Sequence, residues 1–193
     1  MSEFSEFLKL GFFHILDYSS LDHLLFVAAL TIGYGRGEIN KLIILLTAFT
    51  VGHAITLGLA VSDKLFLDEK YVEFLIPLTI IITGVYHLAT MSKKGGKMIW
   101  IYLITIFFGL IHGMGYASTF KSLYGSSEKI LAPILQFNLG VELGQLLAVF
   151  IFFKAGRLIK RVLNISDKTF KAYTAGVVIA VAFMMLWQNR IFF

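Results

Sequence analysis

The chain has 193 residues, which is the length of a single domain. Hydrophobic residues make up 58 % of it and charged residues only 15 %, a balance that excludes an ordinary soluble domain. The net charge of +5 does not indicate nucleic-acid binding, because the basic residues lie in short segments between apolar blocks. The absence of cysteine excludes disulfides, thiolate metal ligands and cysteine nucleophiles.

The first apolar segment is too long to be one straight membrane helix. Residues 4–34 would form a helix of roughly 45 Å, whereas the hydrocarbon core of a bilayer is about 30 Å thick. The motif DYSS at residues 17–20 favours a break, since Asp and Ser are good N-caps. We therefore expect a short helix on the outer face before Asp17 and a membrane helix that begins near Ser20. Glu3 and Glu6, without an early basic cluster, do not resemble a cleavable signal peptide.

Five further apolar blocks follow, each with few or no Lys or Arg residues. A membrane helix needs about 20 predominantly apolar residues, and these blocks approach or exceed that length. The sequence therefore predicts an all-α integral membrane protein, in which residues 1–193 form one transmembrane domain with about six membrane helices. The approximate spans are 20–34, 42–61, 72–91, 98–120, 130–154 and 171–190.

The distribution of Lys and Arg predicts the orientation, because short cytoplasmic loops are enriched in these residues. The loops after the first, third and fifth spans hold eleven of them, and the opposite side holds six. We therefore expect a multi-pass protein with both termini on the outer side.

Ionisable groups inside membrane helices are costly and usually mark a functional site. All five histidines lie in or beside apolar segments. With the expected orientation, His53 and His112 lie at a similar depth in the outer half of the bilayer. The other polar groups at this depth are Asp22 and His23 at the start of the first span, Glu73 at the start of the third, and Asn138, Glu142 and Gln145 on one face of the fifth.

His87 is the exception, because it lies near the cytoplasmic end of the third span. We expect it to be dispensable for a site in the outer half of the bilayer. Close helix packing is expected at GLIHG, residues 109–113, and at GVELG, residues 140–144. Both have the spacing of small residues that lets membrane helices approach closely, and His112 and Glu142 lie inside them.

Imidazole and carboxylate groups together suit divalent first-row metal ions, and the lack of thiols argues against copper(I). The residues indicate His23, His53 and His112 as ligands, with Asp22 and Glu142 as nearby carboxylates. Adjacent residues on a helix point about 100° apart. We therefore expect one member of the Asp22–His23 pair to bind the ion and the other to hydrogen-bond a ligand. A proton relay would use the same residue types.

Five stretches, in order along the first five spans, carry a family resemblance. They are GFFHILDYSSLDHLLF (11–26), TAFTVGHAITL (47–57), VEFLIPLTI (72–80), FGLIHGMGYAS (108–118) and FNLGVELGQL (137–146). They resemble the HupE/UreJ family of bacterial membrane proteins, associated with hydrogenase and urease accessory functions. The resemblance implies an inner-membrane protein of six to eight helices that is regarded as a nickel or cobalt permease. It places His14, Asp22, His23, His53, Glu73, His112, Asn138, Glu142 and Gln145 at the positions of the family's polar motif.

These observations favour a permease for a divalent transition-metal ion (nickel, cobalt or zinc), or a membrane protein that binds such an ion. The metal ligands expected are His14, Asp22, His23, His53, His112 and Glu142, supported by Glu73, Asn138 and Gln145. The alternative is a metal-dependent, zinc-type intramembrane hydrolase with Asp22 or Glu142 as general base. A third hypothesis is that the polar groups only hold the helices together. The expected partners are the lipid bilayer and the metal ion, not nucleic acid, with homo-oligomerisation left open.

Overall fold

The computed structural model describes residues 3–17, 20–91, 98–124 and 130–188. Within these ranges it contains eight α-helices, one 3₁₀-helix and no strand, which confirms the all-α prediction. The helices are α1 (Glu3–Leu16), α2 (Leu21–Gly33), η2 (Arg36–Glu38), α3 (Ile39–Val61), α4 (Glu69–Thr90), α5 (Met98–Gly115), α6 (Ala117–Tyr124), α7 (Leu131–Val162) and α8 (Asp167–Gln188).

Helices α3, α4, α7 and α8 are each long and apolar enough to cross a bilayer. Two bent pairs, α1 with α2 and α5 with α6, are each apolar enough to be one broken span. Their axes turn by 69° and 45°, respectively. The chain is therefore a multi-pass membrane bundle, as the composition predicts. With its 13 residues, α2 is only about 20 Å long and reaches across the bilayer only together with α1.

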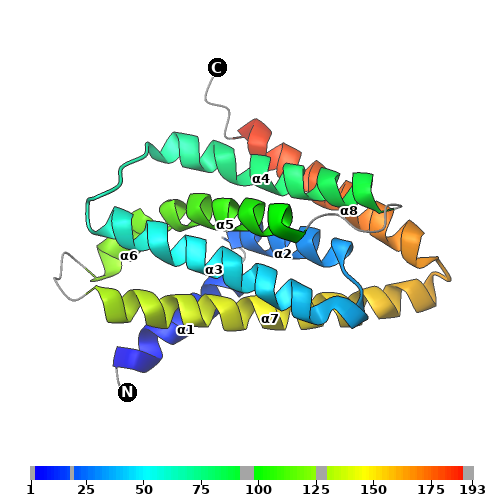
Figure 1. Ribbon diagram of the computed structural model, residues 1–193, viewed down its shortest axis with the longest axis horizontal. Coiled ribbons are helices and arrows are strands. Elements are labelled where there is room, and N and C mark those ends of the chain that lie inside the picture. The colour runs from blue at the N-terminus through cyan, green and yellow to red at the C-terminus, as the bar shows by residue number, and fades with distance from the viewer. Residues whose placement is uncertain (1–2, 18–19, 92–97, 125–129, 189–193) are drawn as a thin grey trace.

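The short helix α2 occupies the centre of the bundle, where it packs against α1, α4, α7 and α8 (Figure 1). Its residues are apolar on nearly every side, a pattern typical of a fully buried helix. Phe26, Val27, Ala29 and Leu30 have no exposed surface. The start of α2 is therefore held at a fixed position inside the bundle.

Two helix pairs, α3 with α5 and α1 with α7, pack at backbone contact. A Cβ atom at Gly109 of α5 would lie 2.1 Å from the carbonyl oxygen of Phe49 in α3. A Cβ atom at Gly140 of α7 would lie 2.1 Å from the carbonyl oxygen of Leu8 in α1. Both distances are far shorter than a side chain tolerates, so the glycines allow the close approach that their spacing predicts.

Both bent pairs break where the sequence disfavours a helix. Residues 98–120, expected as one span, are divided between α5 and α6, and Gly113 and Gly115 precede the break. Each glycine costs a helix about 1 kcal/mol relative to alanine. The expected break near DYSS is present between Leu16 and Leu21. Ser20 occupies the N-cap position of α2, but its side chain makes no capping hydrogen bond.

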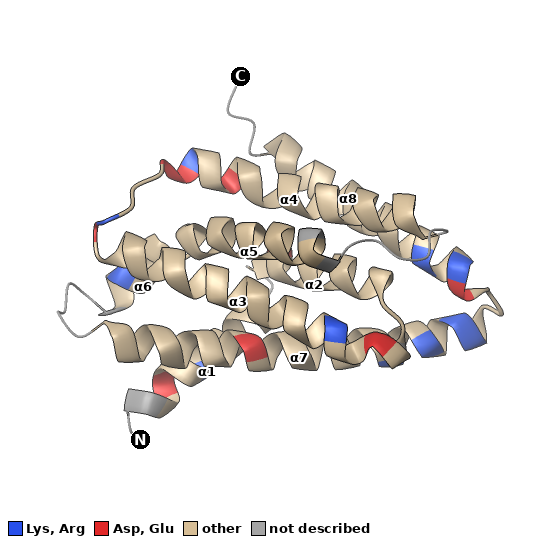
Figure 2. Ribbon diagram, viewed as in Figure 1, with Lys and Arg blue, Asp and Glu red and all other residues tan. Residues whose placement is uncertain are grey.

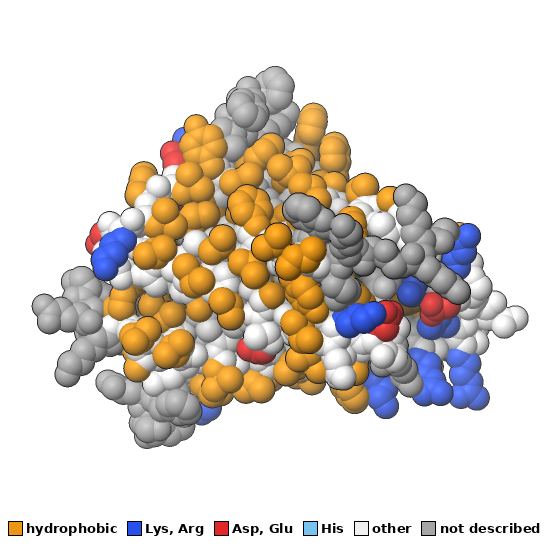
Figure 3. Space-filling view, viewed as in Figure 1, with side chains coloured by type: hydrophobic (Ala, Val, Ile, Leu, Met, Phe, Trp, Pro, Cys, Tyr) orange, Lys and Arg blue, Asp and Glu red, His pale blue; other side chains and the backbone are white. Residues whose placement is uncertain are grey.

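The surface divides into an apolar band and a basic end. Exposed apolar side chains are spread across the middle of the face shown in Figure 3. Lys and Arg gather where α7 ends and α8 begins (Figure 2). With 32 residues, α7 is about 48 Å long, so its last turns extend beyond a hydrocarbon core of about 30 Å. At this end the ammonium of Lys41 donates to Glu38 and lowers the pKa of that carboxyl group.

Candidate metal centre

Four histidines from four helices meet inside the bundle. His14 lies near the end of α1, His23 in the first turn of α2, His53 in α3 and His112 near the end of α5. The ring centroid of His23 lies 4.7 Å from that of His14, 6.0 Å from that of His53 and 5.1 Å from that of His112. His23, His53 and His112 are buried, and His14 is partly buried. We call these four side chains the histidine cluster.

The Nδ1 atoms of three cluster histidines face groups that accept hydrogen bonds. His112 Nδ1 lies 2.9 Å from the carbonyl oxygen of Phe108, which is only an acceptor. His23 Nδ1 lies 3.1 Å from Asp22 Oδ1. His53 Nδ1 lies 2.9 Å from Asn138 Oδ1.

The orientation of the Asn138 amide is itself fixed, because its Nδ2 donates to the carbonyl oxygen of Ile134 at 2.8 Å. Its Oδ1 atom is therefore the end that faces His53. In His23, His53 and His112 the proton thus resides on Nδ1, and each Nε2 presents a lone pair. His14 Nδ1 lies 3.1 Å from the hydroxyl oxygen of Ser20, which can donate or accept.

The Nε2 atoms of all four cluster histidines are buried and have no hydrogen-bond partner within the described part of the chain. Leaving a buried polar atom unpaired costs about 1–3 kcal/mol. One ligand atom each from His14, His23 and His53 lies within 4.8 Å of the other two. Nitrogens on opposite sides of one ion at about 2.1 Å lie about 4.2 Å apart. Small side-chain rotations thus bring these three atoms within reach of a common ion.

The donor set fits a divalent transition-metal ion. Neutral imidazole nitrogens suit nickel, cobalt and zinc. The chain has no cysteine, and no methionine is among the described residues that line the adjacent cavity. A metal-bound histidine usually donates its other N–H to a carboxylate, a carbonyl or another acceptor. His23, His53 and His112 each have that arrangement, through Asp22, Asn138 and Phe108.

The fold adds negative potential around the cluster. Helices α1 and α5 both end there, and the C-terminal end of a helix carries a partial negative charge that favours cations. The positive N-terminal end of α2 faces the same place, and Asp22 lies in its first turn. The carboxylate of Asp22 offsets that positive end, so a cation meets a favourable potential.

A cavity of about 470 Å³ opens beside the cluster, between the two helix breaks. Its walls come from α1, α2, α4, α5 and α6 and carry the carboxyl groups of Asp17 and Asp22. Asp17 is exposed, whereas Asp22 is only slightly accessible. The residues that line the cavity are Leu10, Phe13, His14, Asp17, Ser20, Asp22, His23, Ile76, His112, Gly115, Tyr116 and Thr119.

Other polar residues that the sequence indicated lie outside the cluster. Glu142 Oε1 accepts a hydrogen bond of 2.5 Å from the hydroxyl of Thr47. Gln145 Oε1 accepts one of 3.3 Å from the hydroxyl of Thr50. Both bonds join α3 to α7, and Glu142 does not line the cavity. Glu73 is exposed on α4 and is also absent from the cavity wall.

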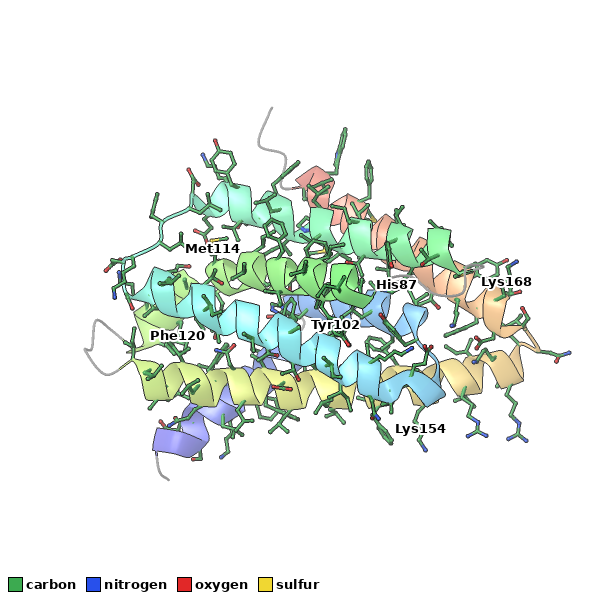
Figure 4. All side chains as sticks on the ribbon, in the orientation of Figure 1. His87, Tyr102, Met114, Phe120, Lys154 and Lys168 are labelled. Carbon is green, nitrogen blue, oxygen red and sulfur yellow. The ribbon has the colours of Figure 1, made fainter. Side chains whose placement is uncertain are left out.

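His87 lies apart from the cluster, toward the other end of α2. A Cβ atom at Gly33 would lie 2.2 Å from the His87 ring, so this histidine packs against the end of α2. About 15 Å of helix separates Gly33 from His23. In Figure 4, His87 lies toward the end that carries Lys168, whereas Met114, two residues after His112, lies toward the opposite end.

Three contributors to the site escaped the sequence interpretation. Ser20, read there only as a helix cap, faces His14 instead. The carbonyl oxygen of Phe108 orients the ring of His112. The two residues are four apart on one helix, a spacing that allows this contact without making it certain. The ring of Tyr116 lies 4.2 Å from that of His14 across the cavity wall. The sequence contained one indication of the role of Ser20, because this residue lies at a helix break six residues after His14.

The comparison with known protein families agrees with these features. The family model described as HupE / UreJ protein matches residues 1–192. The chain belongs to the HupE/UreJ family. No curated protein and no solved structure matches it. The HupE/UreJ match covers both bent helix pairs and all four cluster histidines, so the candidate site lies within the matched residues.

Proposed function

We propose that this HupE/UreJ protein is a permease for a divalent transition-metal ion such as nickel, cobalt or zinc. The observation that carries the proposal is the histidine cluster, in which four buried Nε2 atoms have no hydrogen-bond partner among the described residues. The association of the family with nickel or cobalt transport or accessory function supports it. The ion is the substrate, and His14, His23, His53 and His112 would hold it.

The cavity supplies a route to the cluster. In the proposed sequence of events, a cation enters past Asp17, reaches Asp22 and passes to the four imidazoles. Beyond His23, the apolar residues of α2 seal the path toward the basic end of the bundle. Release on that side therefore requires the helices to move. The breaks after Leu16 and Gly115 are where the α1–α2 and α5–α6 pairs can bend.

Metal binding and transport are tested separately. The purified protein is stripped with a chelator, and Ni²⁺, Co²⁺ and Zn²⁺ binding is measured by calorimetry. Flux is then followed in liposomes that contain a metal-sensitive dye. We expect one tight site, lost in His53→Ala, and flux that is lost with it. His87→Asn is the matched control, since His87 is also a buried histidine but lies outside the cluster. Flux that survives His53→Ala would refute the permease.

The size of the cavity supports a second candidate, a metal-dependent hydrolase. A volume of about 470 Å³ is far more than one ion needs and lies in the range of small-molecule pockets, about 300–1,000 Å³. Three imidazoles, a carboxylate and a metal-bound water are sufficient for hydrolysis. Release of products from bilayer lipids or a membrane peptide that requires the metal and Asp22, in liposomes without metal flux, would favour this candidate.

We further propose a location in the bacterial inner membrane with both termini outside, on the basis of the family and of the basic residues. The chain has no cysteine, so single cysteines can be introduced without removing native ones. A cysteine at Leu65, in the loop between α3 and α4, should react with an impermeant maleimide in intact cells. A cysteine at Lys168, at the basic end, should react only after lysis. The opposite pattern would reverse the orientation.

A further inference from the structure

A second large pocket lies at the basic end, away from the histidine cluster, and nothing in the metal site uses it. It has a volume of about 490 Å³ and lies between the end of α2, the second half of α7 and the start of α8. The lining residues are Ala28, Thr31, Ile32, Tyr34, Gly35, Phe152, Phe153, Gly156, Arg157, Lys160, Asp167, Phe170, Lys171 and Thr174. We call this the basic pocket.

The basic pocket is amphipathic along the axis of α7. On α7 the lining changes from Phe152 and Phe153 to Arg157 and Lys160 within a few residues. Because α7 is longer than the hydrocarbon core is thick, its last turns reach the headgroup region. The aromatic floor therefore lies at the depth of acyl chains, and the cationic rim lies at the depth of headgroups.

The charges of the rim favour an anion. Three basic side chains, Arg157, Lys160 and Lys171, line the pocket with one acid, Asp167. Asp167 pairs with Lys160 at 2.5 Å and with Lys171 at 3.7 Å. No carboxylate pairs with Arg157 among the residues that the structure describes. A guanidinium without a carboxylate partner is well suited to bind a phosphate through two hydrogen bonds.

Small and aromatic residues form the floor of the pocket. Gly156 faces the ring of Phe170, and a Cβ atom there would lie 2.9 Å from that ring. The Lys160 Nζ atom lies 5.6 Å from the centroid of the same ring. This places the ammonium group over the aromatic ring, where it also pairs with Asp167. A molecule with an anionic head and an apolar tail matches both parts of the pocket.

We propose that the basic pocket binds an anionic phospholipid, with the phosphate at Arg157 and Lys171 and an acyl chain against Phe152, Phe153 and Phe170. An anionic phospholipid and free phosphate would both bind the rim through a phosphate group. The apolar floor favours the lipid, because only the lipid has an acyl chain. This inference does not depend on the metal site. The basic residues also lie at the end that their distribution assigns to the cytoplasm, where anionic lipids attract basic side chains.

The test is a lipid titration of the full-length protein in detergent, followed by native mass spectrometry. Phosphatidylglycerol is compared with phosphatidylcholine, and thermal unfolding is measured in parallel. We expect one phosphatidylglycerol to be retained preferentially and to raise the unfolding temperature. Arg157→Gln and Lys171→Gln should each weaken retention about fivefold, the value of one basic residue near an anionic lipid.

Arg161→Gln is the matched control, because Arg161 lies one turn further along α7 and does not line the pocket. It should retain the lipid like the original chain. Equal losses in Arg157→Gln and Arg161→Gln would show general charge attraction and overturn the proposal. Equal retention of the two lipids would overturn it as well. Displacement of phosphatidylglycerol by millimolar inorganic phosphate would show that the apolar floor does not select a lipid, which also contradicts it.

Discussion

The histidine cluster and His87 are two buried imidazole sites in one bundle, and they differ in their surroundings. Both have Nε2 atoms without a hydrogen-bond partner within the described residues. In the cluster, each Nδ1 faces a hydrogen-bonding group and the rings converge. Around His87 lie the backbone of Gly33 and the rings of Tyr34, 5.8 Å away, and Tyr86, 5.3 Å away.

If the proposed function is right, this difference separates a histidine that packs between helices from histidines that bind an ion. A lone imidazole can fill space between helices, as His87 does against Gly33 and the two tyrosine rings. In the cluster, hydrogen bonds fix the ring orientations, and several nitrogen lone pairs point toward a shared space. Packing alone requires neither feature. Four substitutions test this difference, and their expected effects decrease from His23→Ala to Glu142→Gln.

The largest effect is expected for His23→Ala, because His23 contacts the rings of the other three cluster histidines. Loss of a group that only orients a ligand costs about 10–100-fold in affinity, so loss of a ligand should exceed about 100-fold. Calorimetry with Ni²⁺, Co²⁺ and Zn²⁺ measures the change. His87→Asn should leave the affinity unchanged, and a comparable loss in that variant would remove the distinction between the two sites.

An intermediate effect is expected for Asn138→Ala, which removes the acceptor that orients His53. The metal affinity should fall about 10–100-fold while one ion still binds. Asn138→Asp retains an acceptor oxygen at the same position and should lose less. If alanine and aspartate reduce the affinity equally, the hydrogen bond to His53 does not contribute to binding.

Gly113→Ala tests the close packing behind the cluster. A Cβ atom at Gly113 would lie 2.2 Å from the carbonyl oxygen of His53, so α5 must move away from α3 at the level of the site. We expect a loss of about 1–3 kcal/mol in the free energy of unfolding. Gly176→Ala in α8 is the control, since a Cβ atom there meets no atom of the other described segments within 4 Å. Equal stability of the two variants would contradict the packing argument.

The smallest effect is expected for Glu142→Gln. Although the sequence indicated Glu142 as a ligand, its carboxylate bonds Thr47 and does not line the cavity. Distant sites usually couple by less than about 0.5 kcal/mol, so the metal affinity should change no more than about twofold. A loss as large as that of His23→Ala would show that Glu142 moves into the site when the ion binds.

Much of the architecture follows from local sequence. The apolar blocks determine membrane helices because backbone groups in lipid must satisfy their hydrogen bonds internally. The DYSS motif predicts where the first span breaks, and the spacing of Gly109, Gly113, Gly140 and Gly144 predicts which faces can pack closely. These are properties of a few neighbouring residues. The break after Gly115 was not predicted, because the apolar block of residues 98–120 continues across it.

The composition of the cluster required the tertiary structure. Asn138 and Glu142 lie on one face of α7 and are equivalent by helical periodicity, yet only Asn138 reaches a cluster histidine. The helices that carry His14 and His23 are bent by 69° relative to each other. The depth of a residue along one straight helix axis therefore does not predict that these two side chains meet. Which polar group reaches the shared space depends on the rotation of each helix and on the angles between helices. Packing between distant segments sets those rotations and angles, and no local pattern encodes them.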